Sequence, residues 1–199
     1  DVQLEDRALY LERWRQLLLN TLDSSRAELQ FRQNRNEFRR LIDTTWTGKA
    51  SPDSAAYLLV RTFRTLFVRQ VMTALTAPAS AVDPDFDYTR SLRGEGPVWQ
   101  IVTERPQHLL DPKYASWDDH ILAVVDTAIA DLTAGGRSLD TRTWGDTNRT
   151  QVWHPLAAGV PLLGRFLNMP DEPLPGDVYT PRASAPRTGP SERMVVSPG

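Results

Sequence analysis

Residues 142–156, Arg-Thr-Trp-Gly-Asp-Thr-Asn-Arg-Thr-Gln-Val-Trp-His-Pro-Leu, gather polar and aromatic side chains without a helical period. An imidazole and a carboxylate, such as those of His154 and Asp146, are the groups that perform general acid–base catalysis. Binding and catalytic residues are also concentrated on loops. One interpretation of this stretch is therefore an active-site loop.

The local physical chemistry of the same stretch favours a loop that is simply held in place. Trp144-Gly145 allows a tight backbone, and the side chains of Asp146 and Asn148 can hydrogen-bond to neighbouring backbone groups. His154-Pro155 favours an extended turn. A tryptophan buries a large area and so fixes such a loop against its surroundings. Both interpretations stay open at the level of the sequence.

The three histidines of the chain, His108, His120 and His154, show no spacing that would place two metal ligands on one helix face. Asp118 and Asp119, which precede His120, are typical of a helix start, where carboxylates cap free N–H groups and interact with the helix dipole. The sequence therefore predicts no zinc site.

Two further kinds of active-site motif are missing from the sequence. No Gly-x-Ser-x-Gly turn is present that would expose a nucleophilic serine. Gly94-Glu95-Gly96 lacks the third glycine and the preceding strand of a phosphate-binding loop. We therefore assign no catalytic residue, no cofactor-binding residue and no metal ligand in this chain.

A cluster of arginines on one predicted helix suggests nucleic-acid binding at first sight. However, the chain has a formal net charge of -2, and arginine is its default cation throughout. The phenylalanines of the same helix fall on the stripe that should face the core. We therefore expect no nucleic-acid partner. The residues concerned are Arg26, Arg32, Arg35, Arg39 and Arg40, with Phe31 and Phe38.

Length and composition indicate a folded domain or a large part of one. The chain has 199 residues, of which 40% are hydrophobic and 24% are charged, both near the norm for globular proteins. The absence of cysteine excludes disulfides and thiolate chemistry. No apolar run approaches the roughly 20 residues that span a bilayer, and residues 1–6 lack the basic start of a signal peptide. We expect neither a membrane span nor a signal peptide in this stretch.

Apolar residues at three- and four-residue steps predict the first two helices. The first covers residues 4–22. The second follows Ser25, which forms a capping box with Glu28. The stripes predicted to face the core are Leu4, Ala8, Leu11, Leu18 and Leu22 for the first helix, and Ala27, Phe31, Phe38, Leu41 and Ile42 for the second.

Two further long helices are predicted. The first begins at Ser51-Pro52-Asp53, which combines a capping serine, a proline suited to the first turn and an aspartate at the positive end of the dipole, and it ends at Pro78. A short helix follows Pro97. The last long helix is capped by Ser116 and stops at Gly135-Gly136. Its apolar stripe is Ile121, Val124, Val125, Ala128, Ile129 and Leu132.

The chain changes character after Gly136. Nine of its fifteen prolines lie between Pro155 and Pro198, and only residues 193–196 resemble a strand. We therefore divide the chain into a helical region, residues 1–136, and a proline-rich extended segment, residues 137–199. The segment carries too much apolar surface for a flexible linker, so we expect it to pack against other polypeptide. Its large apolar residues are Trp144, Trp153, Leu162, Leu163, Phe166, Leu167, Met169 and Tyr179.

Six short motifs occur in the order in which they stand in the penicillin acylase family. The resemblance runs nearly from end to end of the chain and is to the later part of the family's β-subunit. No single motif is highly specific, but their order is informative. The motifs are residues 3–15, residues 49–54 together with 59–64, residues 142–148, residues 154–156, residues 174–177 and residues 191–196.

This resemblance implies an N-terminal-nucleophile hydrolase with the αββα architecture. In that family a precursor cuts itself to free a β-subunit whose first residue, a serine, attacks an amide with its own α-amino group as base. Because this chain begins with Asp1, we expect a fragment of that enzyme, mainly α with one or a few β-strands. The fragment would act as scaffold, would be inactive alone, and would have no residue that matches the catalytic positions.

The resemblance also implies partners and a location. The fragment would pack against the remainder of the β-subunit and the α-subunit, and the whole enzyme would cleave the amide between an acyl chain and an amine such as a β-lactam nucleus or a homoserine lactone. Calcium belongs to regions of the family outside this chain, and relatives act in the periplasm. The alternative is a free-standing, non-catalytic helical interaction module.

Overall fold

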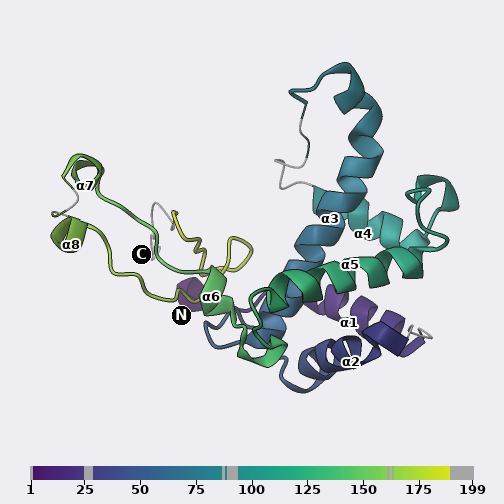
Figure 1. The fold of residues 1–199 in the computed structure, drawn as a ribbon, viewed down its shortest axis with the longest axis horizontal. Helices are drawn as coiled ribbons and strands as arrows, with labels where there is room; N and C mark the ends of the chain where they lie inside the picture. Colours follow the sequence, from purple (N-terminus) through teal and green to yellow (C-terminus); the bar gives the residue numbers. More distant parts are fainter. Residues whose placement is uncertain are drawn as a thin grey trace, which may run out of the picture. The chain divides into compact units, whose positions relative to one another are not determined.

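The structure, a computed structural model, describes residues 2–24, 29–86, 88, 94–160, 162 and 164–188; of residues 29–32 and 158 it describes the main chain alone. The described chain is mainly helical, as predicted (Figure 1). Short 3-10 helices cover Val2–Leu4, Gln107–Leu109 and Leu139–Thr141. The α-helices are α1 (Leu9–Ser24), α2 (Leu29–Thr44), α3 (Ala55–Val82), α4 (Glu95–Glu104), α5 (Trp117–Thr133), α6 (Trp144–Thr147), α7 (Pro155–Gly159) and α8 (Gly164–Leu167).

Strand-like pairing within the described residues is limited to isolated bridges, all antiparallel. They join Arg7 to Lys49, Arg149 to Pro173, and Ala185 to Thr188. The strand predicted over residues 193–196 lies outside the described residues.

The chain divides into two compact units. Unit 1 comprises Asp1–Glu12, Leu41–Leu58 and Asp140–Gly199, and unit 2 comprises Arg13–Arg40 and Leu59–Leu139. Helices α1, α2 and α3 each contribute residues to both units. The division at Gly136 describes a change of composition, and as a domain boundary it stays a prediction.

Aromatic side chains form the centre of unit 2. Trp14 of α1 is fully buried and meets Phe63 and Phe67 of α3 edge to face, with ring centroids 6.3 and 5.9 Å apart. Trp99 of α4 packs against the same indole at 5.1 Å. Edge-to-face pairs add stability beyond the area that they bury. These rings therefore hold α1, α3 and α4 together within the unit.

A carboxylate secures the same three helices. Glu95, in the first turn of α4, accepts hydrogen bonds at Oε1 from Trp14 Nε1 and Arg13 Nη2, both at 2.7 Å. Its Oε2 pairs with Arg64 of α3, whose Nε lies 2.7 Å away. Burial by itself would raise the pKa of Glu95, but the hydrogen bonds from Arg13 and Trp14 and the charge of Arg64 outweigh it, so the pKa lies below its ordinary value.

The first helix begins later than predicted. Leu4 is 49% exposed and lies outside α1, which starts at Leu9. The backbone before it pairs instead with the loop that follows α2: Ala8 N donates to Gly48 O, and Ala50 N donates to Asp6 O, both at 2.9 Å. These bonds require an extended backbone, which excludes the helical conformation over the same residues. Of the rest of the predicted stripe, Ala8, Leu11 and Leu18 are buried and Leu22 is half-buried.

The third helix also begins later than the sequence predicts. Ser51-Pro52-Asp53 forms a turn, and α3 is capped by Ser54, whose Oγ accepts a hydrogen bond from Tyr57 N at 3.2 Å. The carbonyl groups in front of the helix are used by a distant segment. Trp144 N donates to Ser54 O at 3.0 Å, and Gly145 N donates to Pro52 O at 2.7 Å. The cap therefore lies three residues later than predicted, next to carbonyl groups that accept hydrogen bonds from residues 144 and 145.

Pro78 does not end α3, which continues to Val82. A proline inside a helix removes one backbone donor and leaves the carbonyl four residues earlier, that of Ala74, without its partner. The side chains of residues 77–79 are exposed, so water can reach this part of the helix. The exposure explains why the helix tolerates the proline.

Helices α4 and α5 largely follow the sequence. Ser116 Oγ accepts a hydrogen bond from Asp119 N at 3.1 Å, and the predicted stripe of α5 is buried. Gly135 and Gly136 follow α5 with φ of +78° and +79°, a conformation that glycine adopts readily. Helix α4 includes Pro97 in its first turn and begins two residues before it.

The second helix can be compared with its prediction only in part. The capping box of Ser25 with Glu28 lies outside the described residues, as do the side chains of Ala27 and Phe31. The rest of the predicted stripe is confirmed, because Phe38, Leu41 and Ile42 are buried.

Candidate functional site

Trp144 anchors the first half of the loop 142–156 within unit 1. Its side chain is 9% exposed, and Nε1 donates a hydrogen bond to Gly176 O at 2.8 Å. The indole meets the ring of Tyr57 edge to face, with centroids 5.1 Å apart. Thr143 and Asp146 form a capping box around the short helix α6. The polar side chains at this point of the loop thus satisfy the local backbone.

Asn148 connects the loop to the turn that contains Gly176. The residue is 2% exposed, and its Nδ2 lies 2.8 Å from Leu174 O, 3.0 Å from Gly176 O and 3.1 Å from Ser184 Oγ. A carboxamide nitrogen has two N–H bonds, and all of this donor capacity is directed at the opposite segment. Asn148 is therefore a structural crosslink between residues far apart in the sequence.

Asp177 is buried at the same turn, 2% exposed. Tyr57 Oη donates a hydrogen bond to its Oδ2 at 2.9 Å, and Val178 N donates to its Oδ1 at 2.6 Å. The backbone N–H of Asp177 donates to Thr180 Oγ1 at 2.9 Å. A buried carboxylate is tolerated when it is hydrogen-bonded in this way. Trp46 stacks on the ring of Tyr57 at 6.3 Å and completes the cluster.

Two glycines permit this close packing. A Cβ on Gly145 would come within 2.8 Å of Pro52 O and 2.9 Å of Pro173 Cβ. Gly176 has φ of +95°, and a Cβ there would collide with Arg182 O. Side chains cannot enter either position without displacing backbone. The two glycines thus bring the loop 142–148 and the segment 173–184 into contact.

Residues 151–156 of the loop are exposed. Trp153 is 65% exposed, and the guanidinium of Arg187 lies 5.8 Å from the centroid of its ring. His154 is exposed too, and its Nδ1 accepts a hydrogen bond from Leu156 N at 3.2 Å, so that it caps α7 with Pro155 at the first helical position. Because of this hydrogen bond, Nδ1 of His154 is directed at the local backbone and not at a carboxylate side chain. The described geometry therefore supports an anchored loop over residues 142–148.

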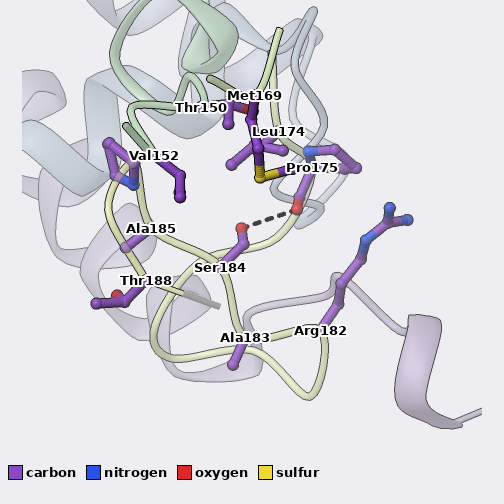
Figure 2. A pocket seen from close by; sticks show the side chains of 11 residues that line it. Thr150, Val152, Met169, Leu174, Pro175, Arg182, Ala183, Ser184, Ala185 and Thr188 are labelled. Carbon is purple, nitrogen blue, oxygen red and sulfur yellow. Dashed lines mark hydrogen bonds between the residues drawn. The ribbon is translucent and has the colours of Figure 1, made fainter. Parts of the chain in front are cut away.

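A pocket of about 220 Å³ lies beside this anchored loop, within unit 1 (Figure 2). Most of its lining side chains are apolar. Thr150 and Val152, which follow the anchored loop in the sequence, form part of its wall. The other lining residues are Met169, Leu174, Pro175, Arg182, Ala183, Ser184, Ala185, Pro186 and Thr188.

The best placed hydroxyl groups of the pocket are already engaged. Ser184 Oγ donates to Pro175 O at 2.9 Å, the bond drawn in Figure 2, and accepts from Asn148 Nδ2 at 3.1 Å. Thr150 Oγ1 donates to Glu172 O at 3.3 Å. In Figure 2 the guanidinium of Arg182 lies at the edge of the group of lining side chains. The pocket is therefore suited to holding an apolar group.

The sequence did not predict this pocket. Its walls come from segments with little periodicity, and the residues that shape it are small or are prolines. The bridges Arg149–Pro173 and Ala185–Thr188 bring these segments together. The sequence did show that the proline-rich segment is rich in apolar residues, which indicated that it contacts other polypeptide. It did not show where on the segment that contact lies.

The other candidate residues belong to unit 2. His120 is 2% exposed and stacks on Tyr114 with centroids 4.2 Å apart, and its Nε2 lies 3.3 Å from Gln70 Oε1. The pKa of His120 is lowered to about 4, chiefly by burial and also by the charge of Lys113, while Asp111 partly compensates.

The remaining histidine and the acidic residues give no sign of a metal centre. His108 is exposed. No three His, Asp or Glu side chains among the described residues converge as they would around a metal ion.

Comparison with known families decides the identity of the chain. A family model described as penicillin amidase matches residues 1–199. The chain belongs to the penicillin amidase family. A search of curated proteins finds no match to it. Penicillin amidases are hydrolases of the N-terminal-nucleophile class, so the resemblance inferred from the six motifs is confirmed.

The structure also bears on membrane association. Over the described residues, none of the helices combines the length and the apolar character needed to cross a bilayer.

Proposed function

We propose that this penicillin amidase family member is part of an amidohydrolase that cleaves the amide between an acyl chain and an amine, of the β-lactam or acyl-homoserine lactone type. The supporting observation is the family match, which extends over residues 1–199. Hydrolysis of a linear amide requires an activated nucleophile and a group that stabilises the oxyanion. In this proposal both lie outside residues 1–199.

The proposed role of residues 1–199 is that of a scaffold. Trp144, Asn148 and Asp177 use their polar atoms for contacts inside unit 1, as expected of residues that fix a segment instead of reacting with substrate. A loop held this rigidly can support reactive groups from behind. We propose that residues 142–156 support the active site in this way.

Calcium, which the family resemblance implies for the complete enzyme, finds no set of ligands among the described residues. This ion takes six to eight oxygen ligands, mostly carboxylates and carbonyls. No three acidic or histidine side chains of the described residues converge, and both carboxylate oxygens of Asp177 already accept a hydrogen bond, from Tyr57 and from Val178. We therefore assign no step of the reaction to calcium bound by these residues.

The partners in this proposal are the remainder of the β-subunit and the α-subunit from the same precursor. The proposed location is the periplasm or the outside of the cell, in keeping with the family. The exposed apolar side chains of the segment after Gly159 support a partner chain, because a monomeric protein rarely leaves such groups in water.

Activity measurements test the proposal. The enzyme expressed from its complete reading frame is incubated with phenylacetyl and long-chain acyl amides, and release of the free amine is followed; purified residues 1–199 serve as the comparison. We expect turnover by the complete enzyme and none by residues 1–199. Turnover by residues 1–199 would overturn the scaffold role, and an inactive complete enzyme would favour a non-catalytic interaction module.

A further inference from the structure

Helices α7 and α8 carry an apolar surface that the described part of unit 1 does not cover. The two short helices pack against each other, yet the large side chains on and beside them face solvent. We name this set the α7–α8 surface. It comprises Val152 (42% exposed), Trp153 (65%), Leu156 (62%), Val160 (50%), Leu162 (78%), Phe166 (81%), Leu167 (40%) and Met169 (57%).

This surface is continuous with the pocket beside the anchored loop. Val152 and Met169 belong to both, and Figure 2 shows both side chains directed into the pocket. The cavity of about 220 Å³ is smaller than the roughly 300–1,000 Å³ of small-molecule sites. Its size and apolar lining suit a single large side chain at the edge of an extended contact.

Charge further defines the partner. Residues 149–169 contain Arg149 and Arg165 and no acidic residue. Arg149 is paired with Asp171 at 2.8 Å, whereas Arg165 is exposed in the last turn of α8, and exposed Arg187 stands over the Trp153 ring. A complementary surface would therefore present carboxylates around an apolar centre.

We propose that the α7–α8 surface docks a second polypeptide segment of the same precursor, which inserts one large apolar side chain into the adjoining pocket and places carboxylates near Arg165 and Arg187. That the partner belongs to the same precursor rests on the proposed two-subunit hydrolase. That this surface contacts another polypeptide does not depend on that proposal. Aromatic anchors seated in a pocket and surrounded by a polar rim are the usual centre of such interfaces.

Site-specific photocrosslinking in the enzyme expressed from its complete reading frame tests this contact. Phe166 or Leu162 is replaced by p-benzoylphenylalanine, and the crosslinked peptides are identified by mass spectrometry. We expect both positions to crosslink to one acidic, apolar peptide of the same precursor. Mixing isotope-labelled and unlabelled enzyme distinguishes contacts within one molecule from contacts between copies.

A second pair of variants tests the pocket. Ala185→Phe fills the cavity and should lower the crosslinking yield at Phe166 about fivefold, as expected when an anchor residue is excluded. Ala130→Phe makes the same change at an exposed position of α5 and should leave the yield unchanged. Absence of crosslinks at both positions, crosslinks between copies, or an equal yield in Ala185→Phe would overturn the proposal. Crosslinking does not need turnover, so these outcomes leave the proposed amide hydrolysis to its own test.

Discussion

Single residues in unit 1 hold segments together that are far apart in the sequence. Part of the anchored loop's role was readable from the sequence: a tryptophan, a glycine and short polar side chains favoured a fixed turn, although an active-site loop stayed open as the other interpretation. The partners of these side chains were not readable, because Gly176 and Ser184 follow Asn148 by 28 and 36 positions, and no local pattern records such a distance. The same limit applies to Ser51, which was expected to cap the third helix: its Oγ donates to Asp53 Oδ1, and Ser54 takes the capping position.

The buried carboxamide of Asn148 gives the first prediction. Asn148→Ala removes the donor to Leu174 O and Gly176 O; Gly176 O keeps the hydrogen bond from Trp144 Nε1, whereas Leu174 O loses its side-chain donor, which should lower the free energy of unfolding by about 1–3 kcal/mol. Urea unfolding followed by tryptophan fluorescence measures the change. The control Gln151→Ala alters an exposed side chain of the same loop and should change stability by less than about 0.5 kcal/mol. Equal effects of the two variants would contradict the role of Asn148.

Buried His120 gives a prediction for pH dependence. Its pKa is lowered to about 4 in the folded chain, chiefly by burial, from an ordinary value of 6.5. The unfolded chain therefore binds more protons between these two values. The stabilisation is complete above pH 6.5 and is lost as the pH falls toward 4, by about 3 kcal/mol in total.

Unfolding by urea at several pH values between 4 and 7 measures this effect, and His120→Gln isolates it. Because glutamine does not titrate, the difference in stability between the native chain and the variant should shrink as the pH falls. A difference that is constant over this range would show that His120 does not titrate as inferred.

At the scale of elements, helix interiors were predictable and helix ends were less so. The stripe of α5 follows from apolar spacing alone, and its residues are buried. The starts of α1 and α3 depend on contacts with other segments. The short helices α6, α7 and α8 were missed, because four or five residues do not establish a period. Their formation depends on local caps, such as Thr143 with Asp146.

The ion cluster around Glu95 gives a prediction for the helices of unit 2. Glu95→Gln keeps the shape of the side chain but removes the charge that pairs with Arg13 and Arg64, which should destabilise the chain by about 2–4 kcal/mol. Thermal unfolding measures the loss. Glu104→Gln makes the same change at an exposed position of the same helix and should cost less than about 0.5 kcal/mol. If both variants melted alike, the cluster would not hold α4 in place.

At the scale of the whole molecule, the proline-rich segment has both buried and exposed large apolar side chains. Trp144 is 9% exposed, whereas Leu162 and Phe166 are 78% and 81% exposed. The sequence predicted that this segment needs other polypeptide, and the exposed side chains agree with that need. The location of the contact required the folded chain, because only the structure places the pocket next to Met169.

The exposure of Phe166 leads to opposite expectations in two settings. In purified residues 1–199 the ring faces water, so Phe166→Ser should reduce self-association, measured by light scattering. In the complete enzyme the ring is proposed to be buried, and the same change should cost about 1.5–3 kcal/mol of stability, measured as faster heat inactivation. Leu9→Ser, at a residue 78% exposed on α1, is the matched control and should not show this reversal of sign. A Phe166→Ser enzyme that resists heat as well as the native enzyme would mean that the ring stays in water there too, since the loss of a buried phenyl group cannot be neutral.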